Sequence, residues 1–298
     1  MYPQQAGTPI VPLLMEKLYE WDEEVPDHAP DLYDFTSLAN SIDGLENVGD
    51  AALQQYAEQG FLSIENAFTP DEVKSSMEGL ADLIAEKNPD FSIIQFHSKV
   101  RDRLHELTIE EKLDNVRKIG QFTDYDERLK TIAFHPKLIA IVEKILGAKA
   151  ELYQSMALIK PPNGREKPWH QDHAYFDLTL ETKVVGVWIA LDEATIDNGC
   201  MRVLPGKRDK EINPHFMIRD WQLCDDQSKE FKSQAVAVPL KPGGCMLFDS
   251  YLPHGTPSNF SSLRRKALQY HYVVVGTPRT SKEKRIEIWG SEGKNVSC

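Results

Sequence analysis

His170, Asp172 and His254 are side chains of the types that together bind a metal ion. On an extended chain, residues two apart point to the same side, so His170 and Asp172 can bind one ion together. Two imidazoles and a carboxylate on one face of an octahedral metal are typical of non-haem iron(II) oxygenases, which keep positions open for a bidentate cosubstrate and dioxygen. The sequence therefore predicts these three residues as ligands of iron(II).

The spacing of His170 and Asp172 has plainer interpretations. About 0.7 His-x-Asp tripeptides are expected by chance in 298 residues with nine histidines and 22 aspartates. The same ligands also suit a zinc ion that activates water for hydrolysis. A non-catalytic binding module, with the acidic N-terminal residues as its interaction element, is a third alternative. Order and context favour iron, because His254 lies about 80 residues further on and an arginine follows it by eleven.

That arginine, Arg265, indicates the cosubstrate. 2-Oxoglutarate chelates iron through its keto acid end and leaves a free carboxylate, which in a buried site requires a fixed cation such as the planar fork of arginine. Arg264 competes for this role, but adjacent residues of a strand face opposite sides. The Arg265-Lys266-Ala267 register favours Arg265. The predicted chemistry is centred on the metal, and no separate acid or base is assigned.

The sequence around these residues resembles the phytanoyl-CoA dioxygenase family over roughly residues 55 to 275. The stretches that carry the resemblance, besides His170-Gln171-Asp172, are Gly186-Val187-Trp188-Ile189-Ala190-Leu191, Asn198-Gly199-Cys200, Leu204-Pro205-Gly206, and His254-Gly255-Thr256 with Asn259 and Arg265-Lys266-Ala267. The chain departs from the family at Lys207-Arg208, where Ser-His commonly follows Pro-Gly. This departure puts a substrate contact from that loop in doubt.

The resemblance implies an enzyme that uses iron(II) and 2-oxoglutarate, with the distal carboxylate of 2-oxoglutarate held by Arg265 and Thr256. It also implies cosubstrate contacts from Lys118, Met156 and Trp188. Each of these three has a structural alternative, Met156 and Trp188 as core residues and Lys118 as a solvated lysine.

The reaction implied by the resemblance is hydroxylation of a C–H bond in a small molecule, with release of succinate and carbon dioxide. An acyl-CoA, an amino-acid-like compound or a secondary metabolite is the expected substrate. Related halogenases lack the metal-binding carboxylate that Asp172 provides, so its presence favours hydroxylation.

Short β-type runs in the second half of the chain must position these side chains. They are separated by turn signals such as Pro161-Pro162-Asn163-Gly164 and Pro242-Gly243-Gly244. The runs span residues 152–159, 184–191, 201–204, 235–240, 245–248 and 267–275. Strands of this number and spacing predict a mostly antiparallel jelly roll, also called a double-stranded β-helix or cupin-like fold.

Helices are expected before these strands. Thr69 predicts a helix start, with Pro70 at the first helical position and Glu72 completing a capping box. A second helix is predicted over 136–146, with a broad apolar face and Gly147 as its end. The fold class is therefore α+β. We expect an N-terminal arm at 1–48, irregular apart from a short helix near 13–21, and one domain at 49–298 with a helical part at 49–148 and a jelly-roll core at about 149–280.

The composition limits the partners. A formal net charge of −12 argues against nucleic acid and anionic membranes, and no apolar run is long enough to cross a bilayer. A small-molecule substrate and dioxygen are the predicted partners, and the sequence indicates no oligomeric state. The absence of secretory and peroxisomal signals predicts a cytoplasmic location. The four cysteines lie far apart, which predicts reduced thiols and no disulfide framework.

Overall fold

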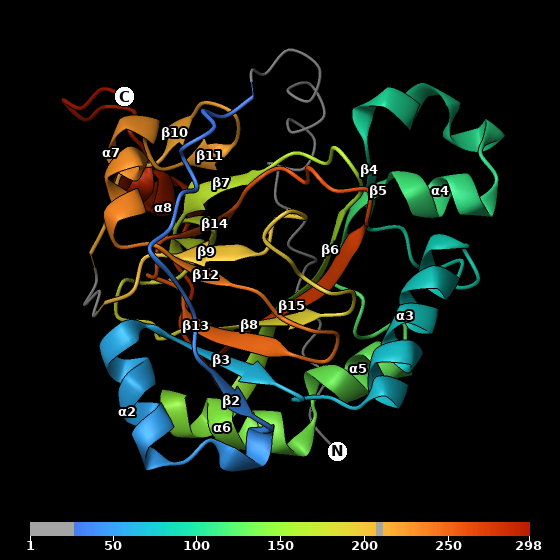
Figure 1. Ribbon diagram of the computed structural model, residues 1–298, viewed down its shortest axis with the longest axis horizontal. Coiled ribbons are helices and arrows are strands. Elements are labelled where there is room, and N and C mark those ends of the chain that lie inside the picture. The colour runs from blue at the N-terminus through green and yellow to red at the C-terminus, as the bar shows by residue number, and fades with distance from the viewer. Residues whose placement is uncertain (1–26, 207–210) are drawn as a thin grey trace.

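Two facing β-sheets form the centre of the molecule (Figure 1). The structure is a computed structural model that describes residues 27–206 and 211–298. The helix predicted near 13–21 and the Lys207-Arg208 loop lie outside these residues. No helix in the described part of the chain is both long and apolar enough to span a membrane.

The larger sheet has eight strands in the order β2-β3-β13-β8-β15-β6-β5-β4, and the smaller has five in the order β1-β12-β9-β14-β7. All their pairings are antiparallel except β1 with β12 and β2 with β3. A separate ribbon joins β10 and β11. The strands are β1 (Ser37–Leu38), β2 (Ser41–Asp43), β3 (Phe61–Glu65), β4 (Ile94–Phe96), β5 (Val116–Gly120), β6 (Ala150–Lys160), β7 (Lys167–His170), β8 (Val185–Ala190), β9 (Met201–Val203), β10 (Phe216–Met217), β11 (Trp221–Gln222), β12 (Val236–Val238), β13 (Cys245–Asp249), β14 (His254–Thr256) and β15 (Arg265–Val274). The predicted antiparallel jelly roll is confirmed.

Most of the helices precede the jelly-roll strands in the chain, as predicted. The helix starting at Pro70 has the predicted capping box, in which Thr69 accepts from the Glu72 amide and the Glu72 carboxylate accepts from the Thr69 amide. The α-helices are α2 (Asp50–Gln59), α3 (Pro70–Ile84), α4 (Ile109–Asn115), α5 (Glu127–Ala133), α6 (Pro136–Leu146), α7 (Asp225–Lys229) and α8 (Lys282–Trp289), and the 3-10 helices are η1 (Leu45–Asn47), η2 (Ser98–Glu106), η3 (Asp172–Tyr175) and η4 (Glu230–Ser233).

Strand β15 separates two environments because its side chains alternate between the two faces of the sheet. Leu268, Tyr270 and Tyr272 face the N-terminal helices and belong to the same apolar core as the buried side of α6. The hydroxyl groups of Tyr270 and Tyr272 donate to carbonyls of α5 at 3.0 and 2.6 Å. The alternate residues of β15 therefore face the smaller sheet, and among these are Arg265 and Gln269.

The end of the predicted arm is more ordered than the sequence indicated. Residues 27–48 were expected to be irregular, yet they contain β1 and β2. Strand β1 is the edge of the smaller sheet and β2 is the edge of the larger one. One short segment thus pairs with both sheets.

The prediction that all four cysteines are reduced is wrong. Cys224 and Cys298 form a disulfide, while Cys200 and Cys245 are free and buried. The bond joins the residue before α7 to the last residue of the chain, across a sequence separation of 74. The two cysteines are far apart in sequence, so only the folded chain brings them together.

Replacing Cys298 by serine is expected to lower the free energy of unfolding by about 2 to 4 kcal/mol, because the cross-link restricts the unfolded chain. Urea denaturation with and without a reductant measures this. The reductant should destabilise the wild type to the level of the C298S variant and leave the variant unchanged. Equal stability of the two proteins in oxidising buffer would contradict the prediction.

Candidate metal centre and cosubstrate cavity

The side chains of His170, Asp172 and His254 converge on one point. Their ligand atoms all lie within 4.8 Å of one another, and all three residues are buried. His170 ends β7 and is the direct cross-strand partner of His254 on β14. Asp172 follows at the start of η3, after an extended Gln171, so the His-x-Asp spacing directs both side chains to the same side. The Oδ1 atom of Asp172 lies 3.3 Å from Nε2 of His170 and 3.7 Å from Nε2 of His254.

Backbone carbonyls orient both imidazoles. Nδ1 of His170 lies 2.7 Å from the Pro168 carbonyl, and Nδ1 of His254 lies 2.9 Å from the Leu252 carbonyl. A carbonyl only accepts, so each Nδ1 carries a proton. In the neutral tautomer that these hydrogen bonds select, Nε2 keeps a lone pair directed at the shared point. Burial and the neighbouring His170 lower the pKa of His254 to about 3, which keeps this ring neutral. Two imidazole nitrogens and one carboxylate oxygen are a donor set that fits iron(II).

The second oxygen of Asp172 is held from the larger sheet. Its Oδ2 atom accepts from Nε2 of His271 at 2.7 Å and from Nε2 of Gln269 at 3.1 Å. Both donors are on β15, and both are buried. The carboxylate is thus fixed with Oδ1 turned toward the two imidazoles.

Arg265 is a buried cation at the start of β15. One guanidinium nitrogen donates to the carbonyl of Gly199, and the group lies 5.2 Å from the centre of the Trp188 ring. Among the described residues, Nε has no hydrogen-bond partner. Burial lowers the pKa of Arg265 to about 10, so it remains charged at neutral pH. Within the described ranges it forms no ion pair with a carboxylate, and a buried charge of this kind favours binding of an anion. Arg264, by contrast, faces outward and pairs with Asp114.

Lys160 lies beside Arg265 and was not predicted. It is the cross-strand partner of Arg265 on β6 and is also buried. Its ammonium group donates to Oγ1 of Thr256 at 2.8 Å and to the carbonyl of Pro257. Burial and the charge of Arg265 lower the pKa of Lys160 well below its ordinary value. Because the Thr256 hydroxyl already accepts from Lys160, its own proton is available to a carboxylate.

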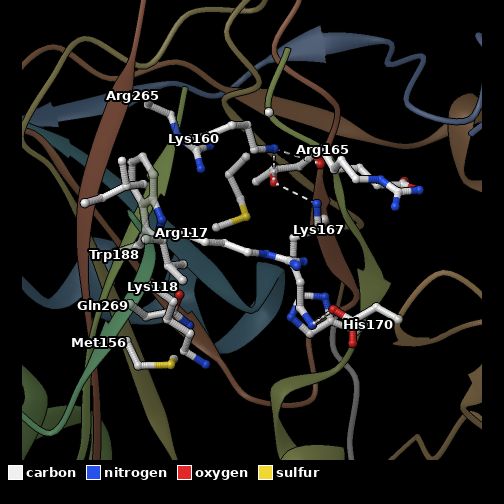
Figure 2. A pocket seen from close by; sticks show the side chains of 18 of the residues that line it. Arg117, Lys118, Met156, Lys160, Arg165, Lys167, His170, Trp188, Arg265 and Gln269 are labelled. Atoms are coloured by element: carbon white, nitrogen blue, oxygen red, sulfur yellow. Dashed lines mark hydrogen bonds and ion pairs between the residues drawn. The ribbon is translucent and has the colours of Figure 1, made fainter. Parts of the chain in front are cut away.

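One cavity of about 180 Å³ contains the metal triad, Arg265 and the four predicted cosubstrate contacts. Lys118 on β5, Met156 on β6 and Trp188 on β8 reach it from the larger sheet, and Thr256 reaches it from β14. Figure 2 shows Arg265 and Lys160 close together, with Trp188, Met156 and Lys118 along one wall. Burial and the nearby Lys167 lower the pKa of Lys118 to about 8. The structure thus brings every predicted site residue to one place.

The sequence of most of the chain fits one family model. The model for phytanoyl-CoA dioxygenase (PhyH) matches residues 56–267, which include the metal triad and Arg265. The chain belongs to the phytanoyl-CoA dioxygenase family. It is a non-haem iron(II) and 2-oxoglutarate-dependent dioxygenase, as the sequence predicted.

Relatives of this family member align over most of its length. Human peroxisomal phytanoyl-CoA dioxygenase is 26% identical over 249 residues, covering 78% of this chain and 72% of the human protein. A Stutzerimonas stutzeri protein named "Probable alpha-ketoglutarate-dependent hypophosphite dioxygenase" is 24% identical over 230 residues, covering 74% and 77%. Each alignment covers about three quarters of this chain.

Solved structures share the fold. EctD from S. alaskensis with 2-oxoglutarate and 5-hydroxyectoine superposes with a TM-score of 0.61 at 21% identity, covering 86% of this chain and 84% of that one. The carbocyclase SnoK from nogalamycin biosynthesis also gives 0.61, at 20% identity, covering 81% and 90%. At these identities the likeness supports the jelly-roll architecture.

The sequence did not predict several polar residues that line the cavity of this family member. They are Arg117, Lys160, Arg165, Glu166, Lys167 and Asp220. Lys167 pairs with Asp220 at 2.6 Å and donates to the hydroxyl of Tyr175 at 3.0 Å. Glu166 accepts from Arg219 and from Tyr33, a residue of the N-terminal segment. These residues differ from solvated surface charges only in their position in the fold. No pattern in the sequence indicates that position.

Proposed function

We propose that this dioxygenase hydroxylates a C–H bond of a small molecule, with iron(II) bound by His170, Asp172 and His254. One arrangement carries the proposal. Three donor atoms within 4.8 Å of one another share a cavity with Arg265, a buried cation that forms no ion pair with a carboxylate among the described residues. The donor set suits iron(II), and the guanidinium fork suits the free carboxylate of 2-oxoglutarate.

When bound, iron(II) and 2-oxoglutarate supply the oxidising chemistry, in which substrate, dioxygen and 2-oxoglutarate become hydroxylated product, succinate and carbon dioxide. The residues of the chain position these reactants. The backbone carbonyls of Pro168 and Leu252 accept hydrogen bonds from the imidazoles of His170 and His254 and so fix the orientation of both rings. Arg265 and Thr256 receive the distal carboxylate, and Lys160 orients Thr256.

The remaining cavity wall excludes water and adds positive charge. Met156 and Trp188 contribute apolar surface that excludes water around the cosubstrate. Lys118 adds a positive charge on the same wall. No protein acid or base is assigned, because the overall reaction of substrate, dioxygen and 2-oxoglutarate neither takes up nor releases a proton.

His271 is proposed as a positioning residue for Asp172. Replacing it by phenylalanine keeps a ring in the same apolar surroundings and removes the hydrogen bond to Oδ2. Iron(II) affinity is expected to fall by roughly 10- to 100-fold, the usual cost of losing an outer-sphere partner. A glutamine at position 271 keeps a donor and should recover part of the affinity. Anaerobic iron titration measures both variants, and equal affinity of H271F and the wild type would contradict the role.

Succinate release tests the function. Purified protein supplied with iron(II), 2-oxoglutarate and oxygen should release succinate slowly without substrate and faster with the correct one. A screen covers acyl-CoAs, amino acids, terpenoids and small oxyanions, because relatives are named for substrates as different as phytanoyl-CoA and hypophosphite. Hydrolytic activity supported by zinc, with no succinate formed in the presence of iron, would refute the proposal.

A further inference from the structure

Strands β6 and β15 form one wall of the cavity, and its chemistry changes along its length. The residues of β6 that line the cavity are, in order along the wall, Lys160, Leu158, Met156 and Gln154. Lys160 pairs with Arg265 across the two strands, and Met156 pairs with Gln269. The wall is therefore cationic at the end proposed to hold the distal carboxylate of 2-oxoglutarate, apolar in the middle, and lined by amides at the other end.

The two ends of this wall are well separated. Gln269 lies four residues after Arg265 on β15, and a strand rises about 3.3 Å per residue, so their backbones are about 13 Å apart. Figure 2 shows Gln269 and Met156 on one part of the wall and Arg265 on another. A molecule bound at the amide end would thus lie away from the distal carboxylate of 2-oxoglutarate.

Gln269 is a buried amide with an unused hydrogen-bond acceptor. Its side chain lines the cavity, and the residue is 4% exposed. The contact of 3.1 Å to Oδ2 of Asp172 identifies the amide nitrogen, because a carboxylate only accepts. The amide oxygen, Oε1, accepts no hydrogen bond from any residue in the described part of the chain. This oxygen is therefore available to a donor on a bound molecule, beside one of the metal ligands.

Gln154 adds a second amide at the same end of the cavity. It pairs with His271 across the two strands, which makes it the diagonal neighbour of Gln269. Diagonal neighbours of an antiparallel pair lie about 7 to 8 Å apart, within reach of long side chains. The side chain of Gln154 lines the cavity and forms no hydrogen bond with residues 27–206 or 211–298. One amide that can accept and one that can both donate and accept therefore adjoin the metal triad.

Two aromatic rings complete this end of the cavity, and both line it. The ring of Phe176 lies 4.8 Å from that of His271, and the ring of Tyr175 lies 5.5 Å from that of His170. The hydroxyl of Tyr175 already donates to the carbonyl of Trp221 and accepts from Lys167. The rings thus offer apolar surface to the body of a molecule whose polar group reaches the amides.

We propose that the substrate carries a neutral group that both donates and accepts hydrogen bonds, a carboxamide or an alcohol, which binds between Gln154 and Gln269. This inference rests on the proposed function and names its substrate class. An apolar group at this position would leave both amides unpaired, which a site built for hydrogen bonding strongly disfavours. A carboxylate has no proton to donate to Oε1 of Gln269. The site therefore favours a neutral donor over both a hydrocarbon and an acid.

The test uses the full chain loaded with manganese(II) and saturating 2-oxoglutarate without oxygen, so that no turnover occurs. Calorimetry compares each donor with a molecule of similar shape that lacks the donor, namely benzamide with acetophenone, hexanamide with 2-heptanone, and benzyl alcohol with benzyl methyl ether. Benzoate and hexanoate are titrated as the acids. At least one donor is expected to bind with a Kd below about 10 mM and roughly tenfold or more tightly than its partner.

Glutamine variants locate the bound donor. Gln154→Met removes one amide at similar size and should weaken the donor by roughly tenfold while changing the affinity for 2-oxoglutarate less. Gln269→Met should weaken both the donor and manganese, because it also removes the hydrogen bond to Asp172. Gln54→Met is the matched control and should change neither, since Gln54 is exposed on α2 and bonds to Glu58 at 2.6 Å.

Four results would overturn the inference. They are equal binding within every pair, no binding of any donor in the stated range, tighter binding of the acids than of their amides, and unchanged donor affinity in both Q154M and Q269M. Failure of the wild type to bind 2-oxoglutarate at all would instead refute the proposed function.

Discussion

Replacing Asp172 by alanine is expected to abolish stable iron binding and 2-oxoglutarate-dependent succinate release. The carboxylate supplies one of three donor atoms and the only negative charge among them. Its loss should therefore cost more than the roughly 10- to 100-fold in affinity that follows removal of an outer-sphere partner. It would also leave the hydrogen bonds from His271 and Gln269 without their acceptor.

Metal analysis after anaerobic loading, followed by a succinate assay, measures both effects of Asp172→Ala. Asp226→Ala is the matched control, because Asp226 is exposed on α7 and pairs only with Lys229 among the described residues. The control should retain iron and activity at the wild-type level. Full iron content together with undiminished succinate release in D172A would remove Asp172 from the ligand set.

Replacing Arg265 by methionine is expected to raise the KM for 2-oxoglutarate by at least about 30-fold. Truncating one partner of a buried, hydrogen-bonded charge pair costs about 2 to 5 kcal/mol, and every 1.4 kcal/mol is tenfold. Arg265→Lys keeps the charge but not the planar fork, so its KM should lie between those of methionine and arginine.

A purely structural role for Arg265 predicts a different result. Without 2-oxoglutarate the guanidinium is buried and lacks a carboxylate partner in the described part of the chain, so methionine should not destabilise the free protein. Thermal unfolding with and without 2-oxoglutarate separates the two roles. The cosubstrate should raise the Tm of the wild type and of Arg264→Gln but not that of R265M. A lower Tm for R265M without cosubstrate, with a normal KM, would assign Arg265 to structure alone.

The sequence predicted those parts of the fold that are determined by residues close to one another along the chain. The helix that begins at Pro70 was predicted because Thr69 and Glu72 lie within one turn of it. Strand β14 was missed, because only three residues lie between Pro253 and Pro257. This strand exists through its pairing with β7 and β9, which are distant in sequence.

The candidate site also contains residues that the sequence predicted and residues that only the fold reveals. The metal triad and Arg265 were predicted because few residue types have that chemistry and the family-like stretches surround them. Lys160 could not be identified, since a lysine at the end of an apolar strand is usually solvated. Arg117 lines the cavity at a change of register between β4 and β5 that no local pattern reveals. The Cys224–Cys298 bond likewise exists only through the folded arrangement.

The segment that contains β1 and β2 has a practical consequence for anyone who shortens the protein. A recombinant fragment beginning at residue 49, the predicted domain start, would lose the outermost strand of both sheets. Strands β12 and β3 would then present unpaired backbone groups that can pair with another copy of the chain. We expect such a fragment to precipitate at protein concentrations at which the longer chain stays in solution. An affinity tag therefore belongs ahead of Ser37, so that both edges stay covered during purification.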